Sequence, residues 1–245
     1  MVHGVPEEQL GGGVEAVLFD FHGTIVQVED PLEWVLAAAA ECGATLDLMR
    51  ATWLADRLVT AGRAGGPRPT RIPPQLAEAW ADRDLTPSSH RAAFAGLAAT
   101  VEAGIDGFAE ALYERCLRPE GWRVYADTAP TLRALYAAGV PVAVVSNIGF
   151  DIRALCAELG IAQYVSAWVL SYEVGHCKPD PAIFRLACRA LGVEPARALM
   201  VGDTPADAAA VDLGCRVLVL PAAAPGHVNG LAAVLALALP PPPAR

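Results

Sequence analysis

The stretch EAVLFD, residues 15–20, is an apolar run that ends in a carboxylate, and four later runs share its apolar character. They are PVAVVS (141–146), AWVL (167–170), ALMVGD (198–203) and RVLVL (216–220). Strands that are apolar on both faces are typical of a parallel sheet covered by helices on its two sides. Helical segments separate the later runs, at residues 151–159, 181–191 and 205–213. This alternation of strand and helix predicts an α/β fold with a doubly wound parallel sheet.

A long insertion follows the first run, because about 120 residues separate it from the second, whereas one crossover connection needs only about a dozen. The insertion contains five segments of helical character, at residues 31–41, 46–61, 75–80, 88–101 and 107–117. We therefore expect an α-helical cap made of residues 28–122 and a core made of residues 14–27 and 123–239. Ligands bind beyond the carboxyl ends of the strands in such sheets, so the cap should cover the active site. Residues 1–13 and 240–245 are expected to be flexible.

The composition narrows the range of partners. A formal net charge of −9 and a pI near 5.0 argue against nucleic acid, because phosphate backbones are bound through basic surfaces. Six scattered cysteines without a C-x-x-C pair fit a reduced protein rather than a disulfide framework or a zinc site. No apolar stretch reaches roughly 18 residues, and no signal-peptide pattern opens the chain. We expect a soluble, cytoplasmic protein without a membrane partner; its oligomeric state stays open.

Asp20 opens the sequence DFHGT directly after the first apolar run. A carboxylate at a strand tip can attack phosphorus and form an aspartyl-phosphate, which divides one difficult displacement into two easier ones. Alternatively, Asp20 only caps a turn before Gly23. Ser146 and Asp203 also end apolar runs, and parallel topology brings such residues to the same edge of a sheet.

Two further segments can bind a phosphate. Ser146 and Asn147 place a hydroxyl group and backbone N–H groups at a strand-to-helix junction, which suits a phosphate. The alternative is a simple helix N-cap, which both residue types favour. Lys178, in the sequence KPDP, can neutralise charge on the nucleophile and the phosphoryl oxygens, or it can be an ordinary surface lysine.

Asp203 and Asp207 lie four residues apart in the sequence GDTPAD. Carboxylate oxygens at a strand end suit Mg2+, which needs only one or two protein carboxylates besides waters and a substrate phosphate. Asp207 alone could instead complement the dipole of the first helical turn. The pair together predicts a magnesium site.

These four segments, taken in order, resemble the haloacid dehalogenase-like (HAD) superfamily. The resemblance covers nearly the whole chain and is strongest over residues 142–214. It implies a Rossmann-like core with a helical cap inserted after the first motif, and a Mg2+-dependent phosphatase acting on a small phosphorylated metabolite. It also implies that Asp20 is the nucleophile, that Ser146 and Lys178 bind the phosphoryl group, and that Asp203 and Asp207 supply metal ligands.

One position departs from the HAD pattern, because phosphatases of the family usually carry D-x-D and this chain has His22 at the second Asp. In the family that residue protonates the leaving group and then activates water, and it binds the metal through its backbone carbonyl, which the substitution keeps. Histidine is a reasonable acid or base near neutral pH. Three interpretations follow: His22 replaces the Asp; it slows hydrolysis, giving a weak phosphatase or a phosphotransferase; or the chain is a non-catalytic or regulatory module that binds a phosphorylated ligand.

The expected cap contains no lysine between Val28 and Trp122, which removes the imine-forming residue that the resemblance would require of a phosphonatase. Its cations are arginines, several of which should be solvated. Arg68 and Arg71 lie in the Pro/Gly-rich loop of the cap, and a guanidinium on a loop can clamp a second phosphate or a carboxylate. We take these two as candidate substrate contacts, with surface solubility as the alternative.

Overall fold

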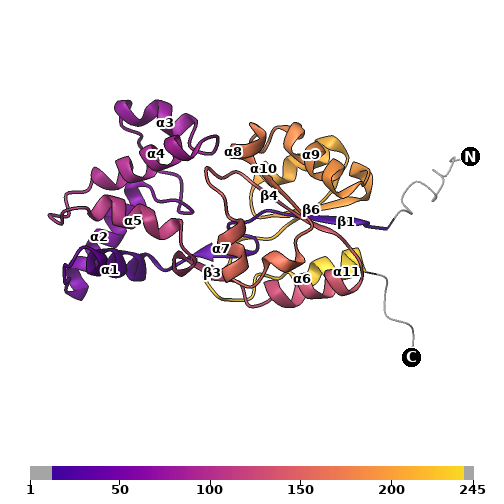
Figure 1. Ribbon diagram of the computed structural model, residues 1–245, viewed down its shortest axis with the longest axis horizontal. Helices are drawn as coiled ribbons and strands as arrows, with labels where there is room; N and C mark the ends of the chain where they lie inside the picture. Colours follow the sequence, from indigo (N-terminus) through magenta and orange to yellow (C-terminus); the bar gives the residue numbers. More distant parts are fainter. Residues whose placement is uncertain (1–12, 240–245) are drawn as a thin grey trace, which may run out of the picture.

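A five-stranded parallel sheet with the strand order β5-β4-β1-β6-β7 forms the centre of one lobe (Figure 1). The computed structural model describes residues 13–239. The strands of this sheet are β1 (Ala16–Phe19), β4 (Val142–Ser146), β5 (Ala167–Leu170), β6 (Ala198–Gly202) and β7 (Arg216–Val219). Val17 lies opposite Val142 on one side of β1 and opposite Leu199 on the other. The predicted doubly wound α/β sheet is confirmed.

Successive side chains of β1 enter two different hydrophobic layers, as the two-residue period of a strand requires. Val17 and Phe19 pack in one layer with residues of the helices below the sheet in Figure 1, and Leu18 packs in the other with Ile183 and Phe184. The helices of this lobe are α6 (Thr128–Ala137), α7 (Arg153–Glu158), α8 (Ser171–Val174), α9 (Pro181–Leu191), α10 (Pro205–Ala208) and α11 (Ala232–Ala238). Because helices cover the two faces of the sheet, we expect a ligand to bind at the polar carboxyl ends of the strands.

A second lobe of helices lies beyond the carboxyl end of β1, on the left of Figure 1. It contains α1 (Pro31–Glu41), α2 (Leu48–Ala61), α3 (Ala77–Ala81), α4 (Pro87–Ala99) and α5 (Phe108–Cys116). The starts of these helices follow sequence signals: Asp30 and Thr86 cap α1 and α4, and a proline occupies the first turn of each, where its missing N–H costs nothing. We call this lobe, residues 31–116, the cap.

Two short antiparallel strands, β2 (Val26–Val28) and β3 (Trp122–Val124), join the cap to the core. Glu29, directly after β2, is buried, and both of its carboxylate oxygens accept hydrogen bonds of 2.6 Å from Arg115 of α5. Arg63 of the cap also donates to the Glu29 carbonyl oxygen, at 3.1 Å. These bonds tie the connection between the lobes to two separate parts of the cap.

Several features differ from the sequence-based expectations. The strands β2 and β3 and the helix α11 were not expected, because three-residue strands and an alanine-rich helix give little periodic signal. The helix expected at residues 205–213 is interrupted, with α10 followed by a 3-10 segment at Ala209–Leu213. The expectation of flexible ends falls mostly on residues 1–12 and 240–245, which lie outside the described residues. Within the described part of the chain, no helix has the length and apolar character needed to cross a bilayer.

Candidate active site

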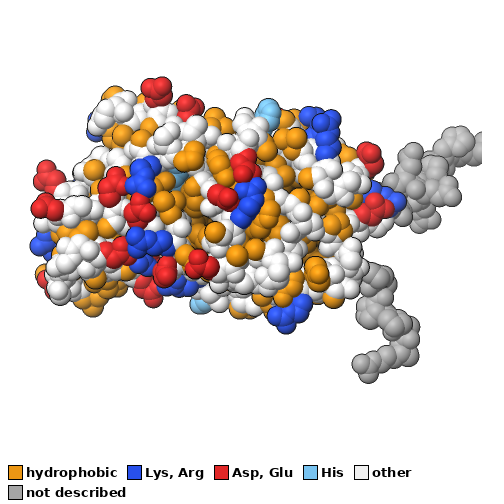
Figure 2. Space-filling model, in the orientation of Figure 1, with side chains coloured by type: hydrophobic (Ala, Val, Ile, Leu, Met, Phe, Trp, Pro, Cys, Tyr) orange, Lys and Arg blue, Asp and Glu red, His pale blue; other side chains and the backbone are white. Residues whose placement is uncertain are grey.

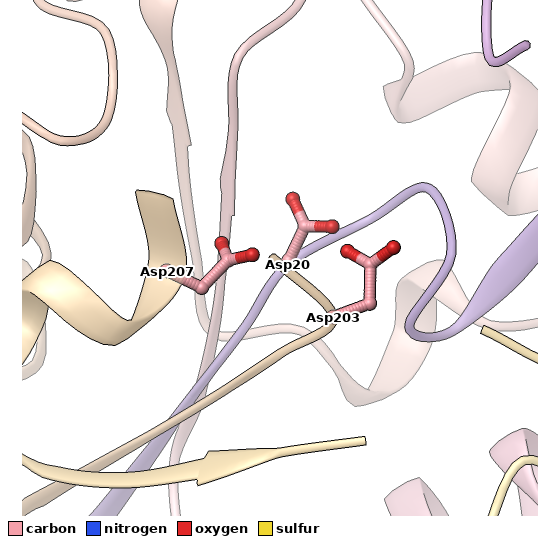
Figure 3. Close-up of side chains that lie close together, drawn as sticks. All are labelled: Asp20, Asp203 and Asp207. Atoms are coloured by element: carbon pink, nitrogen blue, oxygen red, sulfur yellow. The ribbon is translucent and has the colours of Figure 1, made fainter. Parts of the chain in front are cut away.

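Three carboxylates meet where strands β1 and β6 end (Figure 3). Asp20 follows β1, Asp203 follows β6, and Asp207 lies in the first turn of α10. One oxygen of each lies within 4.8 Å of the others, and Figure 3 shows Asp20 between its two neighbours. The backbone N–H of Asp20 still donates to the Val201 carbonyl, at 2.9 Å, so the sheet itself fixes the position of this side chain.

Lys178 lies beside these carboxylates and binds two of them. Its Nζ donates to Asp20 Oδ1 at 2.5 Å and to Asp207 Oδ1 at 2.6 Å, and the residue is only 6% exposed. Burial alone would lower the pKa of Lys178, but the carboxylates of Asp20 and Asp207 raise it further than burial lowers it. The only lysine in the chain is therefore a buried, charged group at the strand ends rather than a surface residue.

Asn147 holds Lys178 in place through the backbone. The Asn147 side chain accepts a hydrogen bond from the Lys178 N–H at 2.7 Å and donates one to the Lys178 carbonyl at 2.9 Å. Its amide thus bonds to Lys178 through both its oxygen and its nitrogen, and one side-chain N–H and the backbone of Asn147 remain for the predicted phosphate contact. The hydroxyl group of Ser146, by contrast, has no hydrogen-bond partner among residues 13–239 and lines a cavity.

The cluster carries more negative than positive charge, and the pKa values reflect this. Burial raises the pKa of Asp20 to about 7, against the opposing effect of Lys178 and with a smaller contribution from Asp207. Burial and Asp207 likewise raise the pKa of Asp203 to about 6. For Asp207, burial is outweighed by Lys178 and by the hydrogen bonds from Thr204, and its pKa lies below the usual value. A divalent cation would balance the excess charge and favour the ionised carboxylates.

The donor set fits a hard cation such as Mg2+, but its members are not equally available. Asp207 uses Oδ1 for Lys178, while its Oδ2 accepts from the Thr204 N–H at 3.0 Å and from the Thr204 hydroxyl at 2.6 Å. Asp203 has no such side-chain partners among the described residues. Gly23, at φ +81°, makes room for it, because a Cβ at position 23 would lie 2.3 Å from Asp203 Oδ2. Asp20 and Asp203 are accordingly the carboxylates best placed to bind a metal directly, and Asp207 mainly positions Lys178.

His22 lies next to this cluster, at the start of the connection to the cap. Its Nε2 is 2.6 Å from Gln27 Oε1, which also accepts from the Val28 N–H at 2.9 Å. The amide oxygen of Gln27 can only accept, so Nε2 carries the proton and Nδ1 has the free lone pair. Burial lowers the pKa of His22 to about 4, although the bond with Gln27 acts in the opposite direction. His22 is therefore a neutral imidazole of fixed tautomer.

A cavity of about 100 Å³ lies between the cap and the core, next to Ser146 and His22. The cap contributes Asp84, His90, Phe94 and Gly65 to its lining. The cap is held against the core here, because the Ser171 hydroxyl donates to the Asp84 carbonyl at 2.5 Å. This small, partly open space, lined by Ser146 and by His22 two residues after Asp20, is the candidate substrate cavity.

The structure does not bring Arg68 and Arg71 to this cavity. Both are exposed, and Arg71 lines a different hollow of about 570 Å³ between α2, α4 and the loop before α3. The geometry thus gives no support to their predicted role as substrate contacts. Arg63, nearer to the site, stacks on Trp34 with its guanidinium carbon 4.2 Å from the ring centroid.

Four residues that position or line the site were not singled out from the sequence. Thr24 donates to Asp20 Oδ2 at 3.4 Å, and Asn229 donates to the carbonyls of Gly23 and Thr24 at 3.1 and 2.9 Å. Asp84 and His90 reach the cavity from the cap. Thr24 lies within the DFHGT sequence and could have been found there, whereas the other three carry no local signal.

The comparisons with known proteins agree with this arrangement. The sequence model of the haloacid dehalogenase-like hydrolase family matches residues 14–211, and the chain belongs to that family. Haloacid dehalogenase-like hydrolase domain-containing protein 3 of Danio rerio is 34% identical over 99 residues, which cover 40% of this chain and 41% of that protein. The phosphoserine phosphatase of Thermus thermophilus is 43% identical over 68 residues, 27% of each chain. The match therefore spans less than half the length of either relative.

Among solved structures, a dehalogenase crystallised as an intermediate complex has a TM-score of 0.64 to this chain. Its sequence is 21% identical, over 94% of this chain and 99% of that one. At this level of identity the similarity establishes a shared fold for core and cap, and the chemistry has to be argued from the site itself.

Proposed function

We propose that this chain is a Mg2+-dependent phosphatase that hydrolyses a small phosphomonoester through an aspartyl-phosphate on Asp20. The observation that carries the proposal is the bond between Lys178 Nζ and Asp20 Oδ1, 2.5 Å long and buried at the strand ends. A buried cation that contacts both a nucleophile and a second carboxylate suits the transfer of a group with negatively charged oxygens. The phosphatase named among the relatives supports the same reaction class.

The first step forms a bond between a carboxylate oxygen of Asp20 and phosphorus, and breaks the bond from phosphorus to the ester oxygen. Lys178 and the Ser146 hydroxyl hold the phosphoryl oxygens, and the leaving alcohol departs into the cavity beneath the cap. Mg2+ held by Asp20 and Asp203 would supply positive charge that stabilises the transferring phosphoryl group. In the second step a water molecule attacks the aspartyl-phosphate, so that inorganic phosphate leaves and Asp20 is regenerated.

His22 is the candidate acid and base for these steps. A neutral imidazole with its free lone pair on Nδ1 is in the protonation state that can accept a proton from the attacking water in the second step, where a pKa of about 4 makes it a weak base. It is less suited to donate a proton to the leaving alcohol in the first step, because its pKa of about 4 leaves little imidazolium at neutral pH. We therefore propose that leaving groups with low pKa values, such as aryl alcohols, are hydrolysed faster than alkyl ones.

The test uses an aryl phosphate in the presence of Mg2+ and compares the wild type with Asp20→Asn. We expect phosphate release by the wild type and a loss of at least ~10³-fold in the variant, because a carboxamide is a poor nucleophile. Asp212→Asn, the same change at an exposed position, is the matched control and should keep full activity. Equal rates for Asp20→Asn and the wild type would refute the proposal.

The alternative of a phosphotransferase with slow hydrolysis is tested on the same protein. His22 lacks the carboxylate usual at its position, so release of the aryl alcohol should be compared with release of phosphate in the presence of added alcohol acceptors. Equal amounts of the two products support hydrolysis. Less free phosphate than aryl alcohol, with the missing phosphoryl group found on the acceptor, supports transfer. A large gain in phosphate release by His22→Asp would show that His22 limits the second step. Bound Mg2+ without either product would support the binding module.

A further inference from the structure

The cap presents one charged group to the substrate cavity, and that group is an acid. Asp84 lies in the loop between α3 and α4 and is one of the residues that line the cavity. Its Oδ2 forms an ion pair of 3.1 Å with Arg83, and its side chain is 18% exposed. No hydrogen bond to Oδ1 exists among residues 13–239, so this oxygen is free to accept one from a ligand.

The two nearby arginines, Arg83 and Arg63, do not line this cavity. Arg83 stacks on Trp80 at 4.2 Å and donates to the Trp80 carbonyl at 2.7 Å. Arg63 lines a separate cavity of about 20 Å³ on the other side of Ala64 and donates to the Glu29 carbonyl. Elsewhere on the cap, acidic and basic side chains lie side by side on the outer surface in Figure 2. The described part of the cap thus offers the leaving group no cation within the cavity lining.

The remaining polar group from the cap is His90. This residue is 3% exposed, and its Nδ1 lies 2.9 Å from the Tyr113 hydroxyl. Its Nε2 has no partner among the described residues, and it is not one of the fully enclosed unpaired atoms, so it opens to the cavity that the residue lines. Phe94, one turn further along α4, adds an apolar wall. A ligand with several hydroxyl groups would satisfy both residues, because an O–H group can donate to Asp84 and can either donate to or accept from His90 Nε2.

The cavity volume limits the size of this ligand. About 100 Å³ lies well below the roughly 300–1,000 Å³ typical of sites for larger ligands. A leaving group of a few carbon atoms fits within this space, whereas a nucleoside would have to extend out of it.

We propose that the substrates are small phosphomonoesters whose leaving group is uncharged or cationic and donates hydrogen bonds, such as a short polyol or an amino alcohol, and that Asp84 rejects leaving groups that carry a carboxylate. This inference rests on the proposed function, because it assigns the leaving group of that reaction to this cavity. Asp84 acts here as a specificity residue and not in the chemical steps.

The test compares glycerol 3-phosphate with 3-phosphoglycerate, which have the same three-carbon skeleton but end in a hydroxymethyl group and a carboxylate. We expect kcat/KM for glycerol 3-phosphate to exceed that for 3-phosphoglycerate by roughly tenfold or more, since two like charges would meet at a partly buried position. Phosphoethanolamine, with a cationic leaving group, should be hydrolysed at least as well as glycerol 3-phosphate. Asp84→Asn keeps the shape of the side chain and should reduce the tenfold ratio to within about threefold.

Asp82→Asn is the matched control, because Asp82 lies in the same loop, is exposed and does not line the cavity. It should leave the ratio unchanged. A ratio near one in the wild type, a preference for 3-phosphoglycerate, or equal responses of Asp84→Asn and Asp82→Asn would overturn the inference. A preference for 3-phosphoglycerate that Arg63→Gln abolishes would assign specificity to Arg63 instead.

Binding measurements separate this inference from the proposed function. Calorimetry on the Asp20→Asn protein in Mg2+ compares the affinity of the two phosphoesters without turnover, and glycerol 3-phosphate should bind roughly tenfold more tightly. If the wild type releases no phosphate from any ester, the proposed function fails while this comparison still decides the role of Asp84. Failure of the Asp20→Asn protein to bind either compound, or equal binding of both, would contradict the inference.

Discussion

The core and the cap meet the substrate cavity with different kinds of side chain. The core lines the cavity with Ser146 and His22, and it also holds the buried carboxylates of Asp20 and Asp207, both bonded to Lys178. The cap contributes an acid paired with a neighbouring arginine, a neutral histidine and an aromatic ring. The core residues are held by contacts within the core, whereas the cap residues reach the cavity only when the cap lies against the core. This difference suggests that the core performs the chemistry and that the cap selects the leaving group.

Removing the central cation should produce the largest effect on the core. Lys178→Met leaves the carboxylates of Asp20 and Asp207 buried without their counter-charge, and breaking such a buried pair costs ~3–5 kcal/mol. We expect the free energy of unfolding in urea, measured without metal at pH 7.5, to fall by this amount, together with a loss of activity of at least ~10²-fold. Arg185→Met, which removes an exposed cation from α9, should change stability by less than ~0.5 kcal/mol. Similar small losses in both variants would show that the cluster does not hold the core together.

Addition of Mg2+ should stabilise the folded core, by less than the loss expected for Lys178→Met. At a concentration 100 times the dissociation constant, binding to the folded state alone adds ~2.7 kcal/mol, which a rise of the melting temperature on adding Mg2+ would report. Asp203→Asn should remove most of this rise, because the Asp203 carboxylate has no side-chain hydrogen-bond partner among the described residues and is free to bind the metal. Asp212→Asn provides the control at an exposed position. A full rise in the Asp203→Asn protein would place the metal elsewhere.

Gly149→Ala should separate the cap from the core without disturbing the carboxylates. A Cβ at position 149 would lie 2.4 Å from the Arg83 carbonyl oxygen and 2.5 Å from the His90 Cβ. The cap could then not pack against the core as it does in this structure. Overpacking of this kind costs ~2 kcal/mol, which corresponds to roughly 30-fold in kcat/KM. The Mg2+-dependent rise in melting temperature should survive, because the carboxylates that would bind the metal lie in the core.

Gly13→Ala is the control for this change, since a Cβ at position 13 meets no atom within 4 Å. Unchanged kcat/KM in Gly149→Ala would mean that the cap does not need to contact this loop during turnover. Loss of the Mg2+ effect as well would show that the substitution damages the core rather than the seating of the cap.

The core site could be predicted from the sequence because its geometry is local to strand ends. Asp20, Ser146 and Asp203 each end an apolar run, and parallel pairing places such residues together whatever the rest of the chain does. Lys178 was assigned through the resemblance, and the structure places it against Asp20 as that assignment requires. The role of the Asn147 side chain was not visible, because its partner is the backbone of a residue 31 positions later.

The cap side of the site was beyond the reach of sequence patterns. Asp84 and His90 reach the cavity through tertiary packing of a loop and a helix face, and nothing in their immediate neighbours distinguishes them from other polar residues of the cap. The loop arginines Arg68 and Arg71 appeared better candidates because cations suit phosphorylated ligands, yet both are exposed and lie away from the cavity. Large aromatic side chains of the cap are equally hard to place from the sequence: Trp53 is 51% exposed, because Leu54 and Leu58 belong to the buried face of α2 and Trp53 does not.

The smallest expected effect is on the pH dependence of the free energy of unfolding. It comes from His90, the neutral histidine of the cap, and differs in sign from the effect of the core carboxylates. Burial, together with Arg83, lowers the pKa of His90 to about 3, whereas an unfolded histidine titrates near 6.5. Between these values the unfolded chain binds a proton that the folded chain does not, so the stability contributed by neutral His90 is complete above pH 6.5 and declines as the pH falls toward 3. Between pH 7.5 and 5.5 this decline amounts to ~1.4 kcal/mol.

His90→Asn should remove that decline, because the amide can still bond to Tyr113 but does not titrate. The core acts in the opposite direction: the raised pKa values of Asp20 and Asp203 mean that the folded state takes up protons first, which adds stability as the pH falls. These carboxylates are present in both proteins, so the difference between the two urea-unfolding series from pH 7.5 to 5.5 isolates His90. Wild type should lose stability relative to His90→Asn over this range, whatever the sign of its own slope. Parallel series would mean that His90 is accessible to protons in the folded protein, and hence that the cap opens readily in solution.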